Sequence, residues 1–355
     1  MAEEETCCGC VSLDAEAEYN MGLHIAAIFI LFCVSAAGTV LPLAARRFQV
    51  ASDSVVLEAL FAFSFGVVIA TGLIHMINEG IERLGNECLG SVVEEYGALG
   101  PAFVLITLVL MHFIECESAV FFMGKVPALG HGHGHGHAHG HDHVQTAAIG
   151  AQEEPSASSI VVTTPDQVAM HSPSEIENPY RSKEAEAAAE DAKSAVRRTI
   201  ATVIFEAGVI FHSIIIGLDL GVTAGADFKT LLAAICFHQF FEGIAIGNSA
   251  LRSIESRSKL LLMNLAFAVT TPIGLVIGIA IRSSYSSSST TALWVEGILD
   301  CVAGGILLYT GLVELMTYNM TTNDKFLSRS TAQRLTIHLG LWLGAGAMAL
   351  IGKWA

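Results

Sequence analysis

The chain has 355 residues, of which 52% are hydrophobic and only 15% are charged, and its formal net charge is −16. Soluble domains carry about 25% charged residues, so this composition argues against a soluble globular protein. The negative charge also argues against nucleic acid as a partner, because the phosphate backbone is itself anionic.

The apolar residues are gathered into eight runs, each close to the length that a bilayer-spanning helix needs, about 20 residues. The runs cover residues 22–45, 55–78, 99–123, 200–222, 229–250, 260–281, 292–316 and 335–354. Backbone polar groups must be paired internally in lipid, so such runs form helices. The sequence therefore predicts an all-α, polytopic membrane protein with eight transmembrane helices. The acidic first 20 residues lack the basic start of a cleavable signal peptide.

Orientation follows from the positive charges. Of the 18 Lys and Arg residues, 14 lie in the segments that join runs 1–2, 3–4, 5–6 and 7–8. The positive-inside rule places these segments in the cytosol and both termini outside. We expect the plasma membrane with extracellular N- and C-termini, although a vacuolar or endosomal membrane would give the same pattern. The outer segments are acidic, which either attracts cations or only solvates the surface.

The chain thus divides into an extracellular acidic tail with cysteines (1–21), helices 1–3 (22–124), a cytosolic loop (125–198) and helices 4–8 (199–355). Cys7, Cys8 and Cys10 in the tail and Cys88 in the next outer loop could form a disulfide or capture metal, and the sequence does not decide between these. The remaining cysteines lie in apolar runs and are expected to be packing residues: Cys33, Cys116, Cys236 and Cys301.

Residues 125–198 contain five of the eight prolines and many Ser, Ala and Glu residues, which predicts a disordered loop. The loop opens with HGHGHGHAHGHDH, whose seven histidines are His131, His133, His135, His137, His139, His141 and His143. Neutral imidazole binds transition metals, and glycine spacers let the chain fold around an ion. We interpret the tract as a site for metal buffering or sensing rather than transport. An expression tag is the alternative, but tags are usually contiguous and terminal. Residues 183–198 are predicted to form a short charged helix.

Two runs place ionisable residues where lipid-facing side chains are expected. His238 and Glu242 are one helical turn apart, so they share a face. The preceding run contains His212, and the short loop between the runs allows all three side chains to converge. Charged residues inside a bilayer usually face the bundle interior and have a function. Two imidazoles and one carboxylate form a plausible divalent-metal site with positions left for water. The alternative is a histidine–carboxylate hydrogen bond that only holds two helices together.

Other polar residues within the runs have less definite roles. His75 and Glu79 are one turn apart at the outer end of run 2 and could form an ordinary helix-end pair. His24 and His338 are expected to be packing histidines, and Asp219 either serves the outer vestibule or caps its helix. The further polar positions are His112, Glu115, Glu117, Glu206, Glu296, Asp300 and Glu314.

The pair FHSIIIGLDLG and FHQFFEGIAIG resembles helices 4 and 5 of the ZIP (Zrt/Irt-like) metal transporters, in the branch of plant and yeast zinc and iron importers. FAFSFGVVIATGLIHMINEG is similar to the second helix of that family, VTTPIG to the sixth and WVEGILDCVAGGILLYTGLVEL to the seventh. The resemblance implies eight helices in a 3+2+3 arrangement with an inverted repeat. It also implies a metal site between helices 4 and 5, and it assigns His75 and Glu79 to the metal access route.

By this resemblance, His212, His238 and Glu242 bind the metal, with Ser213 and Gln239 in support. Some family members bind two metals with carboxylates that this chain lacks, since Gln239 and Thr271 stand at two of those positions. We therefore predict a mononuclear site. The expected function is import of zinc or iron(II), or manganese, into the cytosol, with the lipid bilayer as surroundings and no permanent cofactor or enzymatic activity. The oligomeric state is open, with a homodimer as one candidate.

Three other functions compete with metal import. A membrane metal sensor could use the same site without flux, and uptake assays would separate it from a transporter. A cation-diffusion exporter would have six spans and intramembrane HxxxD pairs, which the sequence lacks. An intramembrane metalloprotease would need an HExxH motif, which is also missing.

Overall fold

The computed structural model describes residue 8 and residues 19–48, 54–90, 93, 95–123, 179–286 and 288–353. All regular elements within these residues are helices. Residues 131–143, Cys7 and Cys10 lie outside the described residues. Contacts divide the chain into a body, residues 1–124 and 192–355, and a second unit, residues 125–191. The described part of the second unit, residues 179–191, is helical, so the predicted loop ends in a helix.

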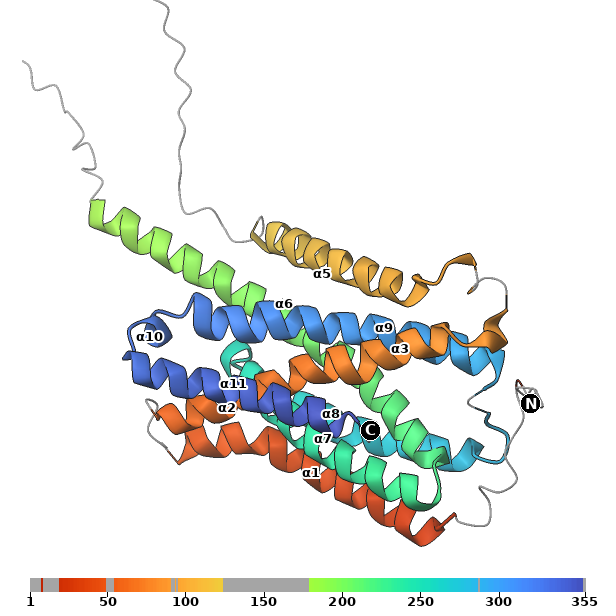
Figure 1. The fold of residues 1–355 in the computed structure, drawn as a ribbon. Coiled ribbons are helices and arrows are strands. Elements are labelled where there is room, and N and C mark those ends of the chain that lie inside the picture. Colours follow the sequence, from red (N-terminus) through yellow and green to blue (C-terminus); the bar gives the residue numbers. More distant parts are fainter. Residues whose placement is uncertain are drawn as a thin grey trace, which may run out of the picture. The chain divides into compact units, whose positions relative to one another are not determined.

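The described body contains eight helices that are long and apolar enough to cross a membrane, which confirms the predicted fold class (Figure 1). The helices, with short turns between some of them, are α1 (Met21–Arg47), α2 (Val55–Ala70) continued by η2 (Thr71–Ile77) and α3 (Asn78–Leu84), η3 (Glu87–Leu89), α5 (Leu99–Met123), α6 (Pro179–Val222), α7 (Gly225–Ser253), α8 (Arg257–Ile281), α9 (Thr290–Thr310) continued by η4 (Gly311–Thr321), α10 (Asp324–Leu327) and α11 (Thr331–Ile351).

Polar residues fix several helix starts. The Asn20 side chain accepts a hydrogen bond from the backbone N–H of Leu23, and Ser54 and Ser289 cap α2 and α9 in the same way. Ser330 and Gln333 form a capping box at the start of α11. Such caps pair backbone donors that the first helical turn leaves free. The apolar runs therefore begin as helices at defined residues.

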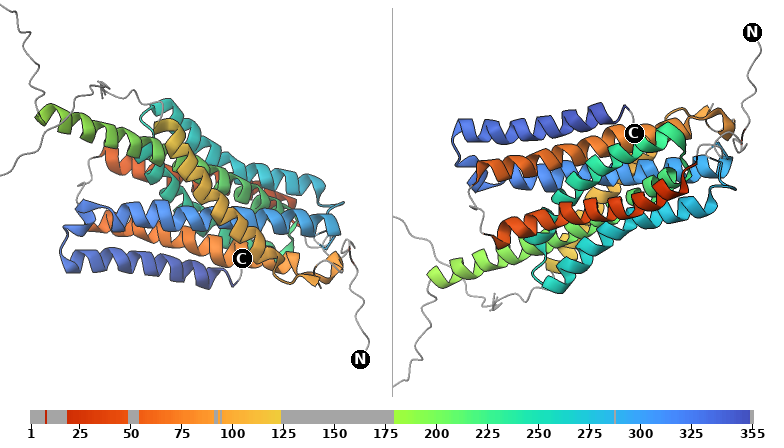
Figure 2. Two further views of the ribbon diagram at one scale, coloured as in Figure 1. Left: turned by 90° about the horizontal axis from the view of Figure 1, so that it is seen from above. Right: turned by 90° about the horizontal axis from the view of Figure 1, so that it is seen from below.

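The helices of the body pack as two bundles. In the first, α1 packs against α7 and α8, and a buried cluster joins Leu31 of α1, Leu220 of α6, Phe228 of α7 and Leu275 of α8. In the second, α2 lies along α11, while α3 and α5 pack against α9 (Figures 1 and 2). A larger apolar core joins the two bundles, with residues from α2, α6, α7, α8 and α9.

Close approach of these helices depends on glycine. A Cβ atom at Gly38 of α1 would lie 2.3 Å from the carbonyl oxygen of Phe240 in α7, and one at Gly66 of α2 would lie 2.1 Å from that of Leu341 in α11. Contacts between small residues are typical of membrane helices, where packing replaces the hydrophobic effect. The outer faces remain apolar and exposed, as with Leu105 of α5 and Trp342 of α11, which suits contact with lipid.

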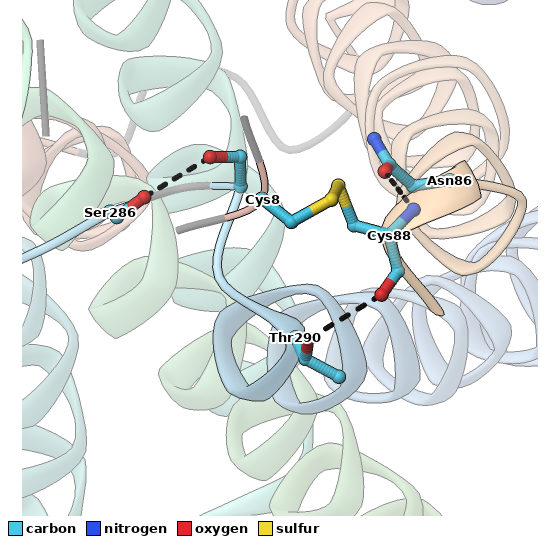
Figure 3. The surroundings of a disulfide bond; sticks show 6 residues. Cys8, Asn86, Cys88, Ser286 and Thr290 are labelled. Carbon is cyan, nitrogen blue, oxygen red and sulfur yellow. Dashed lines mark hydrogen bonds between the residues drawn. A yellow bond between two sulfur atoms is a disulfide. The ribbon is translucent and has the colours of Figure 1, made fainter. Parts of the chain in front are cut away.

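A disulfide joins Cys8 in the N-terminal tail to Cys88 in η3 (Figure 3), with a Cα–Cα distance of 5.6 Å. Of the alternatives that the sequence left open for these two cysteines, the structure has the disulfide. We call the end of the body that carries the start of α1 and Cys88 the N face. Because the eight helices alternate in direction, the starts of α2, α6, α8 and α11 lie at the opposite face.

Candidate metal site

His212 of α6 and His238 and Glu242 of α7 converge inside the body. Each offers one ligand atom, and these atoms lie within 4.8 Å of one another. The side chains are 2%, 0% and 0% exposed. Because α7 begins only three residues after α6 ends, the two helices are adjacent and antiparallel. The one-turn spacing of His238 and Glu242 directs both toward His212, as the sequence predicted.

The polar atoms of this site have no protein partner in the described part of the chain. They include Nε2 of His212, both ring nitrogens of His238 and both carboxylate oxygens of Glu242. Leaving a buried polar group unpaired is costly, and native proteins rarely do so without a reason. A neutral imidazole has a lone pair on one of its two ring nitrogens, so a bound cation would be coordinated by one nitrogen of each histidine and by the Glu242 carboxylate. The alternative of a histidine–carboxylate hydrogen bond is not present among these residues.

Ser213 and Gln239, the predicted supporting residues, are each 0% exposed. The Ser213 hydroxyl and both amide atoms of Gln239 also lack a partner among the described residues. The sequence interpretation did not single out Ser35, Thr71 and Asn264, which are buried with unpartnered polar atoms as well. Residue type gives no signal for Ser35 and Thr71, because serine and threonine in membrane helices usually pair with their own backbone.

His75 lies deeper than the sequence suggested. Its ring centroid is 5.9 Å from that of His212 and 5.5 Å from that of His238, and it is only 4% exposed. The predicted run ended at residue 78, whereas the helix continues through α3 to Leu84. His75 therefore belongs beside the two histidines rather than at a helix end. It lies in η2, a π-helical stretch of a kind often found at functional sites.

Glu79 connects this buried region to the N face. Its Oε1 lies 2.8 Å from Nδ1 of His75, and the Glu79 side chain is 31% exposed. His75 is not within the group of ligand atoms that approach to 4.8 Å. The pair therefore lies on the N-face side of the three-residue site and links it to a partly exposed carboxylate.

A cluster of charges that the sequence interpretation missed lies further toward the N face. Arg83 of α3 contacts Asp219 at 2.8 Å, Asp300 at 2.9 Å, Glu296 at 3.1 Å and Glu79 at 3.7 Å. We call these five residues the Arg83 cluster. Asp219 is thus an ion-pair partner and not a helix cap. The one sequence signal for this cluster was Arg83 itself, a single arginine among the acidic residues that follow the second apolar run.

Tyr285, in the loop after α8, donates a hydrogen bond of 2.5 Å to Oε1 of Glu296. Burial, and then the charge of Asp219, raises the pKa of the Tyr285 phenol, so it stays protonated as the donor. The Arg83 cluster therefore has paired charges, in contrast to the unpaired atoms around His238.

A cavity of about 460 Å³ lies on the other side of the site, toward the opposite face. Its lining includes Thr202 of α6, Asn248 and Arg252 of α7, and Glu314 and Asn319 of η4. Asn248 follows Glu242 by six residues, or about 9 Å along a helix. The Glu314 Oε1 atom is buried and has no partner in the described chain. The candidate site therefore lies between a polar cavity on one side and the Arg83 cluster on the other.

Two further histidines singled out in the sequence have structural partners. His24 is bonded to the carbonyls of Asn20 and Thr223 at 2.8 and 2.9 Å, and His338 to that of Arg334 at 2.9 Å. They are packing histidines, as predicted.

In α5, Glu115 accepts hydrogen bonds from Arg197 and Tyr309, and His112 lies 3.3 Å from the Tyr309 hydroxyl. Glu117 is exposed. The contacts of Glu115 with Arg197 and Tyr309 tie α5 to α6 and α9. They are separate from the three-residue site.

Known proteins are similar to this chain over nearly its whole length. The family described as ZIP Zinc transporter matches residues 21–352. Zinc transporter 9 of Oryza sativa subsp. japonica is 32% identical over 98% of this chain and 94% of its own. Zinc transporter 8 of the same species is 33% identical over 98% of this chain and 92% of its own. Zinc-regulated transporter 1 of Saccharomyces cerevisiae is 32% identical over 95% of this chain and 88% of its own.

Proposed function

Because the chain belongs to the ZIP zinc transporter family, we propose that it imports a divalent transition metal ion through a single site formed by His212, His238 and Glu242. Membership makes it a membrane transporter rather than an enzyme. The observation that carries the assignment of the site is the set of buried, unpartnered ligand atoms within 4.8 Å of one another. The metal is the substrate, which binds and leaves in each cycle.

Ligand chemistry supports zinc first and iron(II) or manganese after it. Imidazole and carboxylate ligands suit zinc, which takes four of them in a tetrahedral arrangement. Calcium and magnesium prefer oxygen ligands only. The relatives compared above carry zinc in their names. Gln239 and Ser213 are neutral, so a second ion would find little negative charge, which supports a mononuclear site.

Direction follows from the positive charges and the cavity. The opposite face carries most of the Lys and Arg residues, which supports a cytosolic position for it. The N face carries the Cys8–Cys88 disulfide, which suits an oxidising exterior. We therefore propose extracellular termini and a plasma-membrane location. The cavity lined by Asn248 and Glu314 then leads from the site to the cytosol.

The proposed route begins at Glu79 on the partly exposed N face. His75 passes the ion to His212, His238 and Glu242, which replace part of its water shell. A conformational change exposes the site to the cytosolic cavity, from which the ion leaves. The histidines of residues 131–143 accept or sense it on that side.

The test is radioactive zinc uptake in cells that lack their own importers, with the amount of transporter at the cell surface measured in parallel. We expect His212→Ala to lose uptake by at least about tenfold, since loss of even an outer metal-site partner costs that much. His338→Ala is the matched control, because His338 is a membrane histidine whose ring is hydrogen-bonded to a carbonyl of its own helix. Equal uptake by His212→Ala and the parent chain would refute the site, and zinc binding without accumulation would refute transport.

A further inference from the structure

Arg83 is placed to join the two bundles on the N-face side of the site. Arg83 belongs to α3 in the second bundle, as do Glu296 and Asp300 of α9. Asp219 belongs to α6 in the first bundle. The 2.8 Å contact between Arg83 and Asp219 therefore crosses from one bundle to the other, whereas the contacts of Arg83 with α9 stay within a bundle.

The position along the helices puts this contact between the site and the N face. Arg83 follows His75 by eight residues and Asp219 follows His212 by seven, which corresponds to about 12 Å and 10 Å along each helix. His75 and His212 themselves lie in ring contact. The two helices thus meet at the site and again, through the ion pair, nearer the surface.

The partners of Arg83 differ in how firmly they are tied to it. α3 and α9 approach closely, since a Cβ atom at Gly80 would lie 2.9 Å from the carbonyl oxygen of Gly297. Arg83, Glu296 and Asp300 therefore move as one group. If the bundles separate at this end, Arg83 keeps three carboxylate partners, Glu79 on its own helix and Glu296 and Asp300 on α9, which lowers the cost of breaking its contact with Asp219.

From these contacts we infer that Arg83 and Asp219 form a latch that holds the N-face route to the metal site closed, and that the latch must open for the ion to enter. This inference rests on the proposed function, because it assigns the latch to the transport cycle. When the latch opens, Arg83 stays with Glu296 and Asp300, while the Asp219 carboxylate becomes free to face an incoming cation. Closure on this side agrees with a cavity that lies on the other side of the site.

A cysteine placed beneath the latch can report its state. Ile215 lies between His212 and Asp219 on the same stripe of α6, and it is 8% exposed. We would introduce Ile215→Cys in the full chain and treat intact cells with a membrane-impermeant thiol reagent, without added metal. The labelling of each variant is compared with the same variant that keeps Ile215, so that the native cysteines cancel.

Asp219→Asn removes the contact between bundles and should raise labelling at position 215 by roughly two- to fivefold, the range expected for loss of a partly exposed ion pair. The matched control is Asp300→Asn, which also removes one carboxylate from Arg83 but leaves the latch in place, so its labelling should stay near that of the parent. Arg83→Lys serves as a second variant. It keeps the charge, but a single ammonium cannot hold Asp219 and Asp300 together as the guanidinium fork does, so labelling should rise.

Unchanged labelling in both Asp219→Asn and Arg83→Lys would overturn the latch, as would an equal rise in Asp300→Asn. Surface amount and thermal stability are measured for each variant, so that general unfolding is recognised by a lower surface amount or melting temperature and not by the labelling itself. Thiol labelling at position 215 is measured without metal transport, whereas the metal site is tested by zinc uptake in the His212→Ala variant. The latch and the proposed function can therefore fail separately.

Discussion

The metal site and the Arg83 cluster are both polar regions inside an apolar body, but their side chains are satisfied in opposite ways. In the site, the polar atoms of His238 and Glu242 have no protein partner among the described residues. In the Arg83 cluster, one guanidinium is surrounded by carboxylates at 2.8 to 3.7 Å. Buried groups that lack partners indicate a ligand, whereas buried charges that are mutually paired indicate a contact between parts of the protein.

The comparison is tested most severely by neutralising one carboxylate in each region. Glu242→Gln keeps the shape of the side chain but removes the anionic oxygen, so we expect zinc uptake to fall by at least about tenfold. Glu296→Gln makes the same chemical change where Arg83 retains other carboxylates, so its effect on uptake should be clearly smaller. Uptake and surface amount are measured side by side, and equal losses in the two variants would remove the distinction between the regions.

An intermediate effect is expected at Glu79, which belongs to the Arg83 cluster and also contacts His75. Glu79→Gln should reduce uptake at low zinc by about two- to tenfold, because an acidic inlet concentrates cations near the route. Saturating zinc should restore most of the rate, since the site itself is intact. The measurement is the rate of zinc uptake as a function of zinc concentration. The control is Glu82→Gln, which neutralises another acidic residue of α3. A loss that persists at saturating zinc would instead make Glu79 part of the site.

The smallest effect on transport is expected from the histidine-rich tract. Deleting residues 131–143 should leave zinc uptake within about twofold of the parent, because a histidine-rich tract can bind metal by its composition alone, apart from the three-residue site. The response of the cell to excess zinc should change, which is measured as the amount of transporter that remains at the surface after a zinc load. Complete loss of uptake at normal surface amount would place the tract in the transport path.

Much of the fold was predictable because bilayer thickness fixes helix length and lipid excludes irregular backbone. The convergence of His212, His238 and Glu242 was also predictable, since helical spacing and one short loop determine it. The depth of His75 was not, because the helix extends past the apolar run to Leu84 through a π-helical stretch. The partners of Arg83 were not predictable either, because Asp219 and Asp300 are more than a hundred residues away in the chain.

The central claim is that one metal ion binds to two imidazoles and one carboxylate from α6 and α7, and a crystal structure of the full-length protein grown with zinc tests it most directly. An anomalous map at the zinc edge should show one peak in the membrane body, about 2.0 to 2.2 Å from nitrogens of His212 and His238 and an oxygen of Glu242. A saturated crystal with no peak there, or with these three side chains turned away from one another, would contradict the account.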